Sequence, residues 1–299
     1  MSILLPAFAK INLALEVGPR LPDGYHRLRT VFQAVSLCDL VSLRCSPGLE
    51  VKCVWPGVPE GEGNLAYRAA RSLRDLAECL AGRGVRIDLY KAIPPAAGLG
   101  GGSSDAAATL RGLTWLWDVQ VLASEMTRLA AALGSDVPFF LAGGTMLGEG
   151  RGDVCSPLPE LPPCVLVVTW PACQVATAEV YRLWDGASRP PVPGGKGVDA
   201  VRDALEHGDL PGVAGAMWND LRPVTEHLVP EVGELRALLL GAGALGTEMS
   251  GSGPAVFGVF SASRAAERAL DGLHGRGYRA FLCRPVGRWS LYPGAGESG

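Results

Sequence analysis

A glycine-rich run between a predicted strand and a predicted helix is the feature that most constrains this sequence. Residues 85–91 (VRIDLYK) alternate apolar and polar side chains, as a half-buried strand does. Two prolines end this strand, and residues 98–105 (GLGGGSSD) lead into an alanine-rich segment of high helix propensity. We expect the helix to begin inside the run, because Ser103, Ser104 and Asp105 are residue types favoured at helix starts.

This loop has the chemistry of a polyphosphate site. Its glycines leave backbone N–H groups unobstructed, and the helix N-terminus behind them carries a partial positive charge. A flexible turn before an ordinary helix cap is the alternative interpretation of the loop alone. The P-loop motif does not fit, because Gly102 is not followed by Lys and then Ser or Thr. The dinucleotide fingerprint does not fit either, because it requires a third glycine near Ser103.

The length of 299 residues favours two domains that share a cleft. Four prolines lie within residues 157–163, so we place the boundary there, with a first domain at 1–158 and a second at 159–299. Strand-like segments, such as residues 11–17, alternate with helical ones, such as residues 65–80. This alternation predicts an α+β architecture.

Charge and composition argue against several kinds of partner and location. The chain has 27 Lys and Arg against 30 Asp and Glu, a net charge of −3, and no basic block, so we expect no nucleic acid partner. Lys10 interrupts the apolar N-terminus and no run of about 18 apolar residues occurs, so we expect neither an export signal nor a membrane span. The eight cysteines form no C-x-x-C pair, which favours reduced, mostly buried thiols in a cytoplasmic protein.

Other stretches carry polar residues suited to phosphoryl transfer. Such a reaction needs positive charge near the transferred group and a group that deprotonates the acceptor, which Lys10 and Asp136 could supply. Each also has an ordinary interpretation, because Lys10 could snorkel to the surface and Asp136 could bond to its own backbone in a turn. The pair Tyr25 and His26 could be a partly exposed strand end, and residues 251–254 (GSGP) a simple hairpin turn.

Taken together, these stretches resemble one family. They are KINL at 10–13, DGYH at 23–26, PPAAGLGGGSSDAA at 94–107, GSDVPF at 134–139 and MSGSGPAVF at 249–257. In content and order they are similar to the diphosphocytidyl-methylerythritol kinases of the GHMP superfamily, over nearly the whole span from Ala9 to Phe260. The glycine-rich loop supports the superfamily, and the DGYH and GGSSDAA segments support the narrower family.

The resemblance implies a two-domain GHMP kinase fold, with an N-terminal domain like ribosomal protein S5 domain 2 and a ferredoxin-like C-terminal domain. It implies ATP as phosphoryl donor, accompanied by Mg²⁺, for which we assign no protein ligands. The ATP phosphates would follow the glycine-rich loop, and Asn64 would lie near the nucleotide. The residues assigned to ATP are Asn64, Pro95, Ala96, Ala97, Gly98, Leu99, Gly100, Gly101, Gly102, Ser103 and Ser104.

The acceptor that the resemblance implies is the 2-hydroxyl of 4-diphosphocytidyl-2-C-methyl-D-erythritol, on the non-mevalonate route to isopentenyl diphosphate. Asp136 would be the general base, while Lys10 would keep it ionised and stabilise charge on the moving phosphoryl group. Tyr25 would stack on the cytosine, His26 would hydrogen-bond its edge and Tyr181 would cover the other face. The residues assigned to the acceptor are Asn12, Tyr25, His26, Tyr181, Gly251, Ser252 and Gly253.

Two positions depart from the commonest sequence of that family. Gly100 stands where Ala is frequent, which adds flexibility, and Ala255 stands where Thr is frequent, which removes a hydroxyl. We expect these changes to alter affinity without abolishing activity.

Other functions stay open at this point. One is a GHMP kinase of the homoserine or mevalonate type, and another is a non-catalytic nucleotide-binding protein. The pair Tyr25 and His26 favours an acceptor that carries a base, and the presence of both Lys10 and Asp136 favours an enzyme. We expect a monomer or homodimer.

Overall fold

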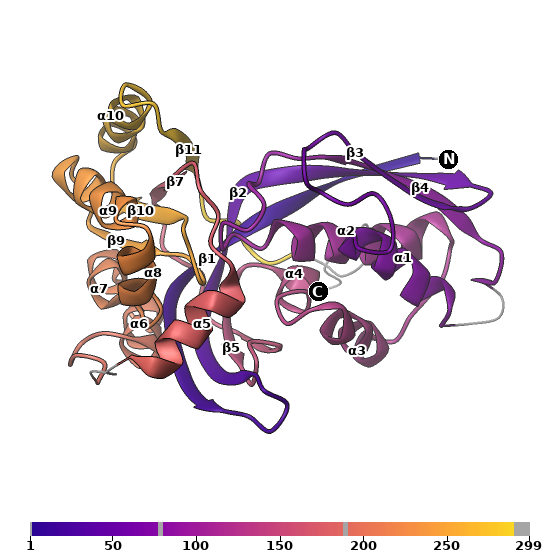
Figure 1. Ribbon diagram of the computed structural model, residues 1–299, viewed down its shortest axis with the longest axis horizontal. Helices are drawn as coiled ribbons and strands as arrows, with labels where there is room; N and C mark the ends of the chain where they lie inside the picture. Colours follow the sequence, from indigo (N-terminus) through magenta and orange to yellow (C-terminus); the bar gives the residue numbers. More distant parts are fainter. Residues whose placement is uncertain (1, 77–79, 188–190, 290–299) are drawn as a thin grey trace.

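The structure, a computed structural model, describes residues 2–76, 80–187 and 191–289. It has two lobes, and two long strands run from the first lobe into the second (Figure 1). These strands, β1 (Ser2–Arg20) and β2 (His26–Ser46), pair antiparallel along most of their length, with irregular register between Phe8 and Ala9 and between Asn12 and Ala14.

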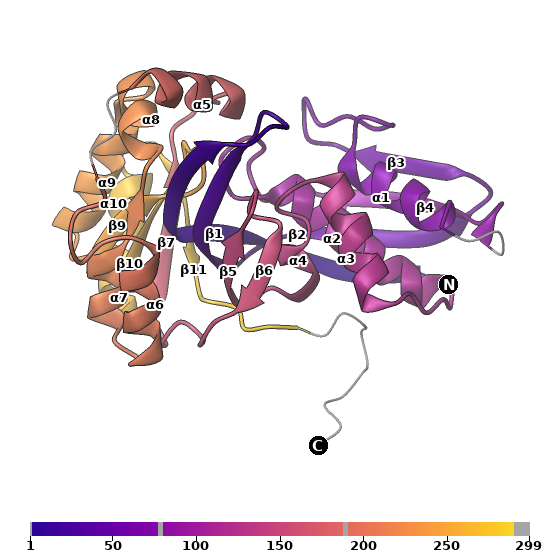
Figure 2. The same ribbon diagram turned by 90° about the horizontal axis from the view of Figure 1, so that it is seen from below.

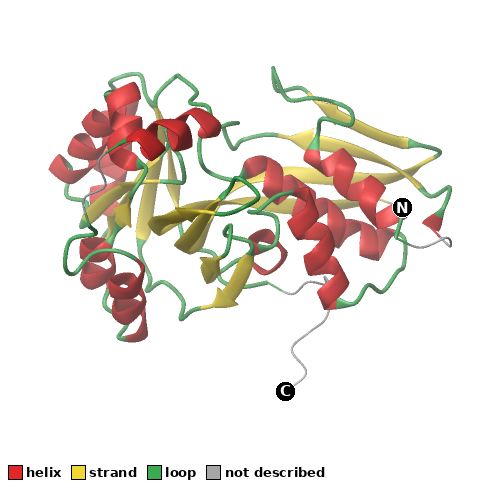
Figure 3. Ribbon diagram, turned by 60° about the horizontal axis from the view of Figure 1, so that its bottom comes forward, coloured by secondary structure: helices red, strands yellow, loops and turns green. Residues whose placement is uncertain are grey.

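Five further strands complete the first sheet, whose order is β3-β4-β2-β1-β8, with β5 paired to β2 and β6. They are β3 (Leu49–Cys53), β4 (Gly84–Tyr90), β5 (Thr145–Glu149), β6 (Val154–Pro157) and β8 (Trp218–Asn219). Four helices lie with this lobe: α1 (Leu65–Arg74), α2 (Gly101–Leu116), α3 (Ala123–Leu133) and α4 (Phe139–Ala142). These helices lie along one side of the sheet (Figure 3). Buried side chains such as Leu43, Leu73 and Leu110 form one core between the sheet and the helices.

The second lobe contains a four-stranded antiparallel sheet in the order β11-β7-β10-β9. Its strands are β7 (Val165–Trp170), β9 (Gly246–Met249), β10 (Val256–Phe260) and β11 (Arg279–Cys283). Counted in chain order this arrangement is 4-1-3-2, which is the ferredoxin-like order.

Helices cover both faces of the second sheet because its central strand is apolar on both sides. Val165 and Val167 of β7 pack with α9 (Glu231–Gly241) and α10 (Ser263–His274). Leu166 and Val168 face the opposite core, which includes β1 and residues of α6 and α7. The remaining helices are α5 (Thr177–Gly186), α6 (Val198–Glu206), α7 (Leu210–Ala216) and α8 (Arg222–Leu228). No helix within the described residues is both long and apolar enough to cross a membrane.

Two predicted elements differ from the structure. The strand expected at residues 11–17 is β1, which starts at Ser2, and its first residues alternate between exposed and buried around Pro6. Pro6 interrupts the sequence pattern, yet this end of β1 is a sheet edge, where proline is tolerated. The helix expected at residues 65–80 ends at Arg74, and residues 77–79 lie outside the described ranges.

The proline-rich residues 157–163 connect β6 to β7. Segments from the second half of the chain nevertheless pair with strands of the first half. β8 pairs with Ala14 and Leu15 of β1, and Pro285 forms a bridge with Val35 of β2. The predicted boundary between residues 158 and 159 stays a prediction.

The cysteines that the structure describes have free thiols, and Cys79 lies outside the described ranges. Cys53, Cys164 and Cys283 are buried, but Cys45 and Cys173 are exposed, so the prediction of mostly buried thiols is wrong for part of the set. Cys45 is the penultimate residue of β2, and Cys173 lies in the connection between β7 and α5.

Candidate active site

Two cavities meet at the glycine-rich loop. The larger, about 630 Å³, is lined from both lobes, by β1, β2, α5 and the turn at Gly251 and Ser252. The smaller, about 350 Å³, is lined by Asn64 and by most of the loop. Gly98 and Gly100 line both cavities, so the loop is the wall between them.

The loop is held in a backbone conformation that requires glycine. Gly98 and Gly100 have φ values of +82° and +72°. A Cβ on Gly98 would lie 2.1 Å from the carbonyl oxygen of Ser250, and one on Gly100 would lie 2.7 Å from the Phe140 ring. Gly100, which the sequence analysis interpreted as a gain in flexibility, therefore fits a site where this chain leaves no room for alanine.

The helix behind the loop starts earlier than expected. α2 begins at Gly101 and its N-cap is Gly100, which makes no side-chain cap hydrogen bond. The prediction that the helix begins inside residues 98–105 is confirmed, but it begins two residues before Ser103, because Gly100 in the left-handed region already turns the chain into the helix. No cap side chain blocks the N-terminal N–H groups of α2, which lie on the wall of the smaller cavity.

The assigned ATP residues divide into two groups. Asn64 and most of the loop line the smaller cavity, whereas Leu99 and Ser104 are buried and line neither. Asn64 is the N-cap of α1, and its amide also donates to the carbonyl of Pro59 at 2.8 Å. The residues that line the smaller cavity are Asn64, Pro95, Ala96, Ala97, Gly98, Gly100, Gly101, Gly102 and Ser103.

Sequence reasoning missed a buried ionic cluster behind this wall. The Lys91 ammonium forms ion pairs with Asp39 and, at 2.6 Å, with Asp105. Asp39 also accepts backbone hydrogen bonds from Ala92 and Ile93 at 2.6 and 2.8 Å. Burial raises the pKa of the Asp105 carboxyl to about 7, against the opposing charge of Lys91. Lys91 and Asp105 both line the smaller cavity, so the cluster ties β2 and the end of β4 to α2 there.

Lys10 and Asp136 lie together in the larger cavity. The Lys10 Nζ is 3.6 Å from Asp136 Oδ2 and donates to Asn12 Oδ1 at 2.6 Å. The side chain of Lys10 is 4% exposed and that of Asp136 is 31% exposed, so the carboxylate is open to the cavity. Burial lowers the pKa of Lys10, and Asp136 opposes this shift. The structure thus brings together two residues that are far apart in sequence.

Aromatic residues gather at the other end of the larger cavity, where the tip of the β1–β2 hairpin lies beside α5 (Figure 2). The rings of His26 and Tyr181 stack with centroids 5.2 Å apart, and His26 Nε2 is 2.9 Å from Asp185 Oδ1. Tyr25 is 58% exposed, with the Arg151 guanidinium 5.0 Å from its ring centroid. Neither Asp185 nor Arg151 could be predicted as a site residue from the sequence, because neither belongs to a recognisable motif.

The turn of the second lobe closes against the loop of the first. Ser250 Oγ donates to the Gly98 carbonyl at 2.9 Å, and the Ala255 N–H donates to the Ala97 carbonyl at 3.1 Å. A Cβ on Gly251 would lie 3.3 Å from Lys10 Nζ, so this turn reaches the Lys10 ammonium.

One residue assigned to the acceptor, Gly253, and the departing position Ala255 do not line the larger cavity. Gly251 and Ser252 line it, but Gly253 does not. The side chain of Ala255 packs in a buried apolar cluster away from both cavities. A hydroxyl at position 255 would therefore enter that cluster and not a cavity.

Comparisons with known proteins agree with the motifs. Residues 64–144 match the GHMP kinases N terminal domain, and residues 201–279 match the GHMP kinases C terminal family. The chain is 45% identical to the 4-diphosphocytidyl-2-C-methyl-D-erythritol kinase of Moorella thermoacetica, covering 91% of this chain and 94% of that relative. It is 39% identical to the kinase of the same name from Exiguobacterium sibiricum, covering 96% and 99%.

Solved structures show the same fold. A crystal structure of 4-(cytidine 5'-diphospho)-2C-methyl-D-erythritol kinase superimposes with a TM-score of 0.79 at 38% identity, covering 95% of this chain and 100% of that one. A homoserine kinase from Cytophaga hutchinsonii has a TM-score of 0.74 at 20% identity, covering 97% and 96%, which shows a shared fold. The predicted GHMP kinase fold is thus confirmed. The chain belongs to the GHMP kinases and, within them, to the family of the 4-diphosphocytidyl-2-C-methyl-D-erythritol kinases.

Proposed function

We propose that the chain transfers the γ-phosphoryl group of ATP to the 2-hydroxyl of 4-diphosphocytidyl-2-C-methyl-D-erythritol. The products are the 2-phosphate and ADP, on the non-mevalonate route to isopentenyl diphosphate. The observation that carries this proposal is the position of Lys10 and Asp136 beside Gly98 and Gly100, where two cavities share a wall. ATP occupies the smaller cavity and the acceptor occupies the larger one.

Asp136 acts as the general base. The acceptor oxygen attacks the γ-phosphorus, its proton passes to the Asp136 carboxylate, and the bond to the β,γ-bridging oxygen breaks to release ADP. The Lys10 ammonium, held by Asn12 and Asp136, stabilises negative charge on the moving phosphoryl group. Burial lowers the pKa of Lys10, but the adjacent carboxylate favours its charged form.

We propose that Mg²⁺ enters with ATP as part of the substrate. Among the described residues, no group of three or more His, Cys, Asp or Glu side chains could hold a metal ion. Mg²⁺ typically keeps several waters and binds through substrate phosphates, so such a protein cage is not required. Free N–H groups at the start of α2 suit the anionic phosphates that carry the ion.

The base of the acceptor fits the aromatic end of the larger cavity. Tyr25 offers an exposed ring for stacking, while Tyr181 and Asp185 hold the His26 ring in one orientation. Homoserine and mevalonate carry no base, so these aromatic residues would have no counterpart in a kinase for either acceptor. We therefore prefer the cytidyl acceptor over the alternatives that share the fold.

We also propose that the enzyme works in the cytoplasm, as a monomer or homodimer. ATP is its donor, and no helix that could anchor it in a membrane occurs among the described residues. Cell fractionation would test the location, and light scattering of the purified protein would test the oligomeric state.

The test is ADP release by the purified protein with Mg-ATP and a panel of acceptors. The panel contains the cytidyl compound, homoserine, mevalonate and galactose. Release with the cytidyl compound alone is the expected result. Release only with another acceptor would keep the kinase and refute the substrate, and no release with any of them would refute the function.

A further inference from the structure

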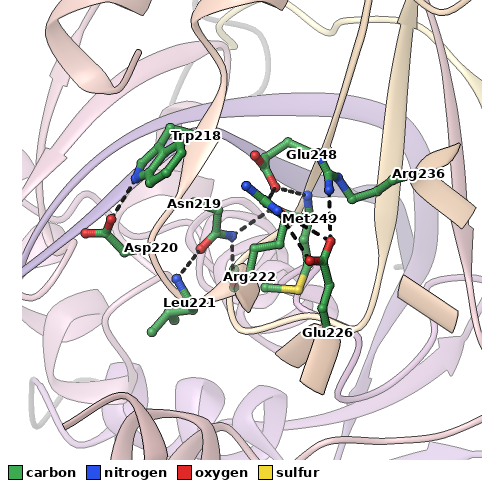
Figure 4. A network of polar contacts seen from close by, with 10 residues as sticks. Trp218, Asn219, Asp220, Leu221, Arg222, Glu226, Arg236, Glu248 and Met249 are labelled. Carbon is green, nitrogen blue, oxygen red and sulfur yellow. Dashed lines mark hydrogen bonds and ion pairs between the residues drawn. The ribbon is translucent and has the colours of Figure 1, made fainter. Parts of the chain in front are cut away.

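Asn219 is a buried polar residue that no step of the proposed reaction uses. It ends β8, is 0% exposed and lies opposite Leu15 of β1. Its side-chain amide donates to the carbonyls of Met249 and Gly251, both at 2.8 Å, and its Oδ1 accepts from the Leu221 N–H at 2.9 Å. Figure 4 shows this side chain between Leu221 and Met249. All of its polar atoms are therefore committed to backbone groups.

The carbonyl of Gly251 fixes the direction of the next N–H group. Gly251 and Ser252 are joined by a trans peptide, in which C=O and N–H point in opposite directions. Because Asn219 holds the carbonyl, the Ser252 N–H points away from Asn219. Asn219 does not line the larger cavity, whereas Gly251 and Ser252 do. The N–H thus lies on the cavity side of the turn.

Within the part of the chain that the structure describes, the N–H groups of Gly251 and Ser252 have no acceptor. Two successive N–H groups of this kind make an anion-binding concavity. The Lys10 ammonium is adjacent to Gly251, so an anion bound by the two N–H groups would also meet Lys10. In the proposed reaction the anion at this place is the transferred phosphoryl group.

A salt-bridge network behind Asn219 supports the same turn (Figure 4). The Glu248 carboxylate accepts from the Met249 N–H at 2.9 Å and forms an ion pair with Arg222 at 2.9 Å. Glu226 joins Arg222 to Arg236. Met249 is therefore held on its N–H side by Glu248 and on its carbonyl side by Asn219, so the strand enters the turn in a fixed orientation.

We propose that Asn219 is a positioning residue for phosphoryl transfer. It orients the peptide between Gly251 and Ser252 so that two backbone N–H groups of the second lobe donate to the transferred phosphoryl group beside Lys10. This inference rests on the proposed function. It adds a contribution from the second lobe to transition-state stabilisation, separate from the binding of the cytidyl base.

The test compares Asn219→Asp and Asn219→Ala with Thr225→Val. Asn219→Asp keeps the acceptor for Leu221 but removes both donors, and Asn219→Ala removes all three bonds. Thr225→Val is the matched control, because this buried hydroxyl bonds to the neighbouring carbonyl of Ser252 at 3.1 Å and leaves the Gly251 carbonyl alone. Activity is expressed per folded protein, with the folded fraction taken from circular dichroism.

Both Asn219 variants should lower kcat by about 10- to 100-fold, because misaligned oxyanion donors lose most of their effect. The KM for the cytidyl acceptor should change by less than about threefold, since Tyr25 and His26 are untouched. Thr225→Val should keep kcat within about threefold of the wild type. Equal kcat in the Asn219 and Thr225 variants would overturn the inference. An inactive wild-type enzyme would instead refute the proposed function.

A second measurement needs no variant, should the Asn219 variants fail to fold. The Ser252 amide of the wild-type protein is followed by ¹⁵N NMR hydrogen exchange, alone and with a non-hydrolysable ATP analogue plus the cytidyl acceptor. Protection of this amide by the two ligands together supports the inference. Unchanged exchange of the Ser252 amide in the ternary complex would overturn it.

Discussion

The two cavities differ in how they are built. The residues that line the smaller cavity all lie between Val58 and Asp105, in the first lobe. The larger needs both lobes, because β1, β2, α5 and the turn at Gly251 all line it. Under the proposed assignment of the substrates, donor binding depends on one local piece of chain, whereas acceptor binding and transfer depend on how the two lobes meet. Four substitutions test this difference.

The largest effect is expected at Asp136, which lines the larger cavity beside Lys10. Asp136→Asn should lower kcat by about 100- to 10,000-fold, because the general base is lost. The dissociation constants of both substrates should stay close to those of the wild type, since neither depends on proton removal. Single-turnover kinetics and calorimetry measure the two quantities. Near-normal turnover would remove Asp136 from the mechanism.

A smaller effect is expected where the lobes touch. Gly98→Ala should lower the free energy of unfolding by about 3 kcal/mol, through left-handed backbone strain and a clash with the Ser250 carbonyl. Gly57→Ala is the matched control, because Gly57 has a φ of +81° with no atom within 4 Å of an added Cβ. Gly57→Ala should lower the free energy of unfolding by about 1 kcal/mol, through backbone strain alone. Urea denaturation gives both values, and equal losses would show that lobe contact at Gly98 does not matter.

The aromatic end of the larger cavity should affect the acceptor alone. Tyr25→Ala should weaken acceptor binding by about 1–3 kcal/mol, through lost base stacking, and leave ATP binding unchanged. Tyr90→Ala is a fair control, since the two tyrosines are 58% and 56% exposed and Tyr90 lines neither cavity. Isothermal titration calorimetry measures the affinity of each variant for the acceptor. Equal affinities of the Tyr25 and Tyr90 variants would contradict the stacking role of Tyr25.

The last test concerns the ionic cluster of the smaller cavity, where the expected effect is a dependence of stability on pH and no change in substrate binding is predicted. Asp105 has a pKa of about 7 in the folded protein against 3.8 ordinarily, so between these values the folded state binds more protons than the unfolded state. Stability should therefore fall as pH rises through this window, by at most about 1.4 kcal/mol per unit, and level off above it. Asp105→Asn should remove this slope. Urea denaturation at pH 4 to 8 gives the free energy of unfolding of both proteins. The same dependence on pH in the wild type and the variant would show that Asp105 does not cause the slope.

Sequence analysis found the residues that short motifs contain. The glycine loop, Lys10 and Asp136 could be identified because each belongs to a segment with a recognisable order of residue types. Their convergence on one wall is visible only in the structure. The sequence placed the start of α2 in the correct run but two residues too late. Helix-cap preferences favour Ser103, whereas Gly100, in the left-handed conformation, is the actual N-cap.

The missed residues are those whose roles arise from contacts across long stretches of chain. Asp185 meets His26 across 159 residues, and Asp39 meets Lys91 across 52. Asn219 holds a carbonyl 32 residues away. A lone Asp or Asn carries no local signal for such a partner, since its pairing depends on how the sheets are assembled.

The pairing of β1 with β8 also sets an order of events during synthesis. The Val17 N–H donates to Asp220 Oδ2 at 2.7 Å, across 203 residues. At the usual rate of translation, Val17 is added to the chain roughly 10–40 s before Asp220. The strand that carries Lys10 and Asn12 is thus among the first segments made. It can pair with β8 only after most of the chain has been synthesised. A nascent chain that ends before β8 already contains the residues that line the smaller cavity, but it lacks both the last strand of the first sheet and the Gly251 turn that lines the larger cavity.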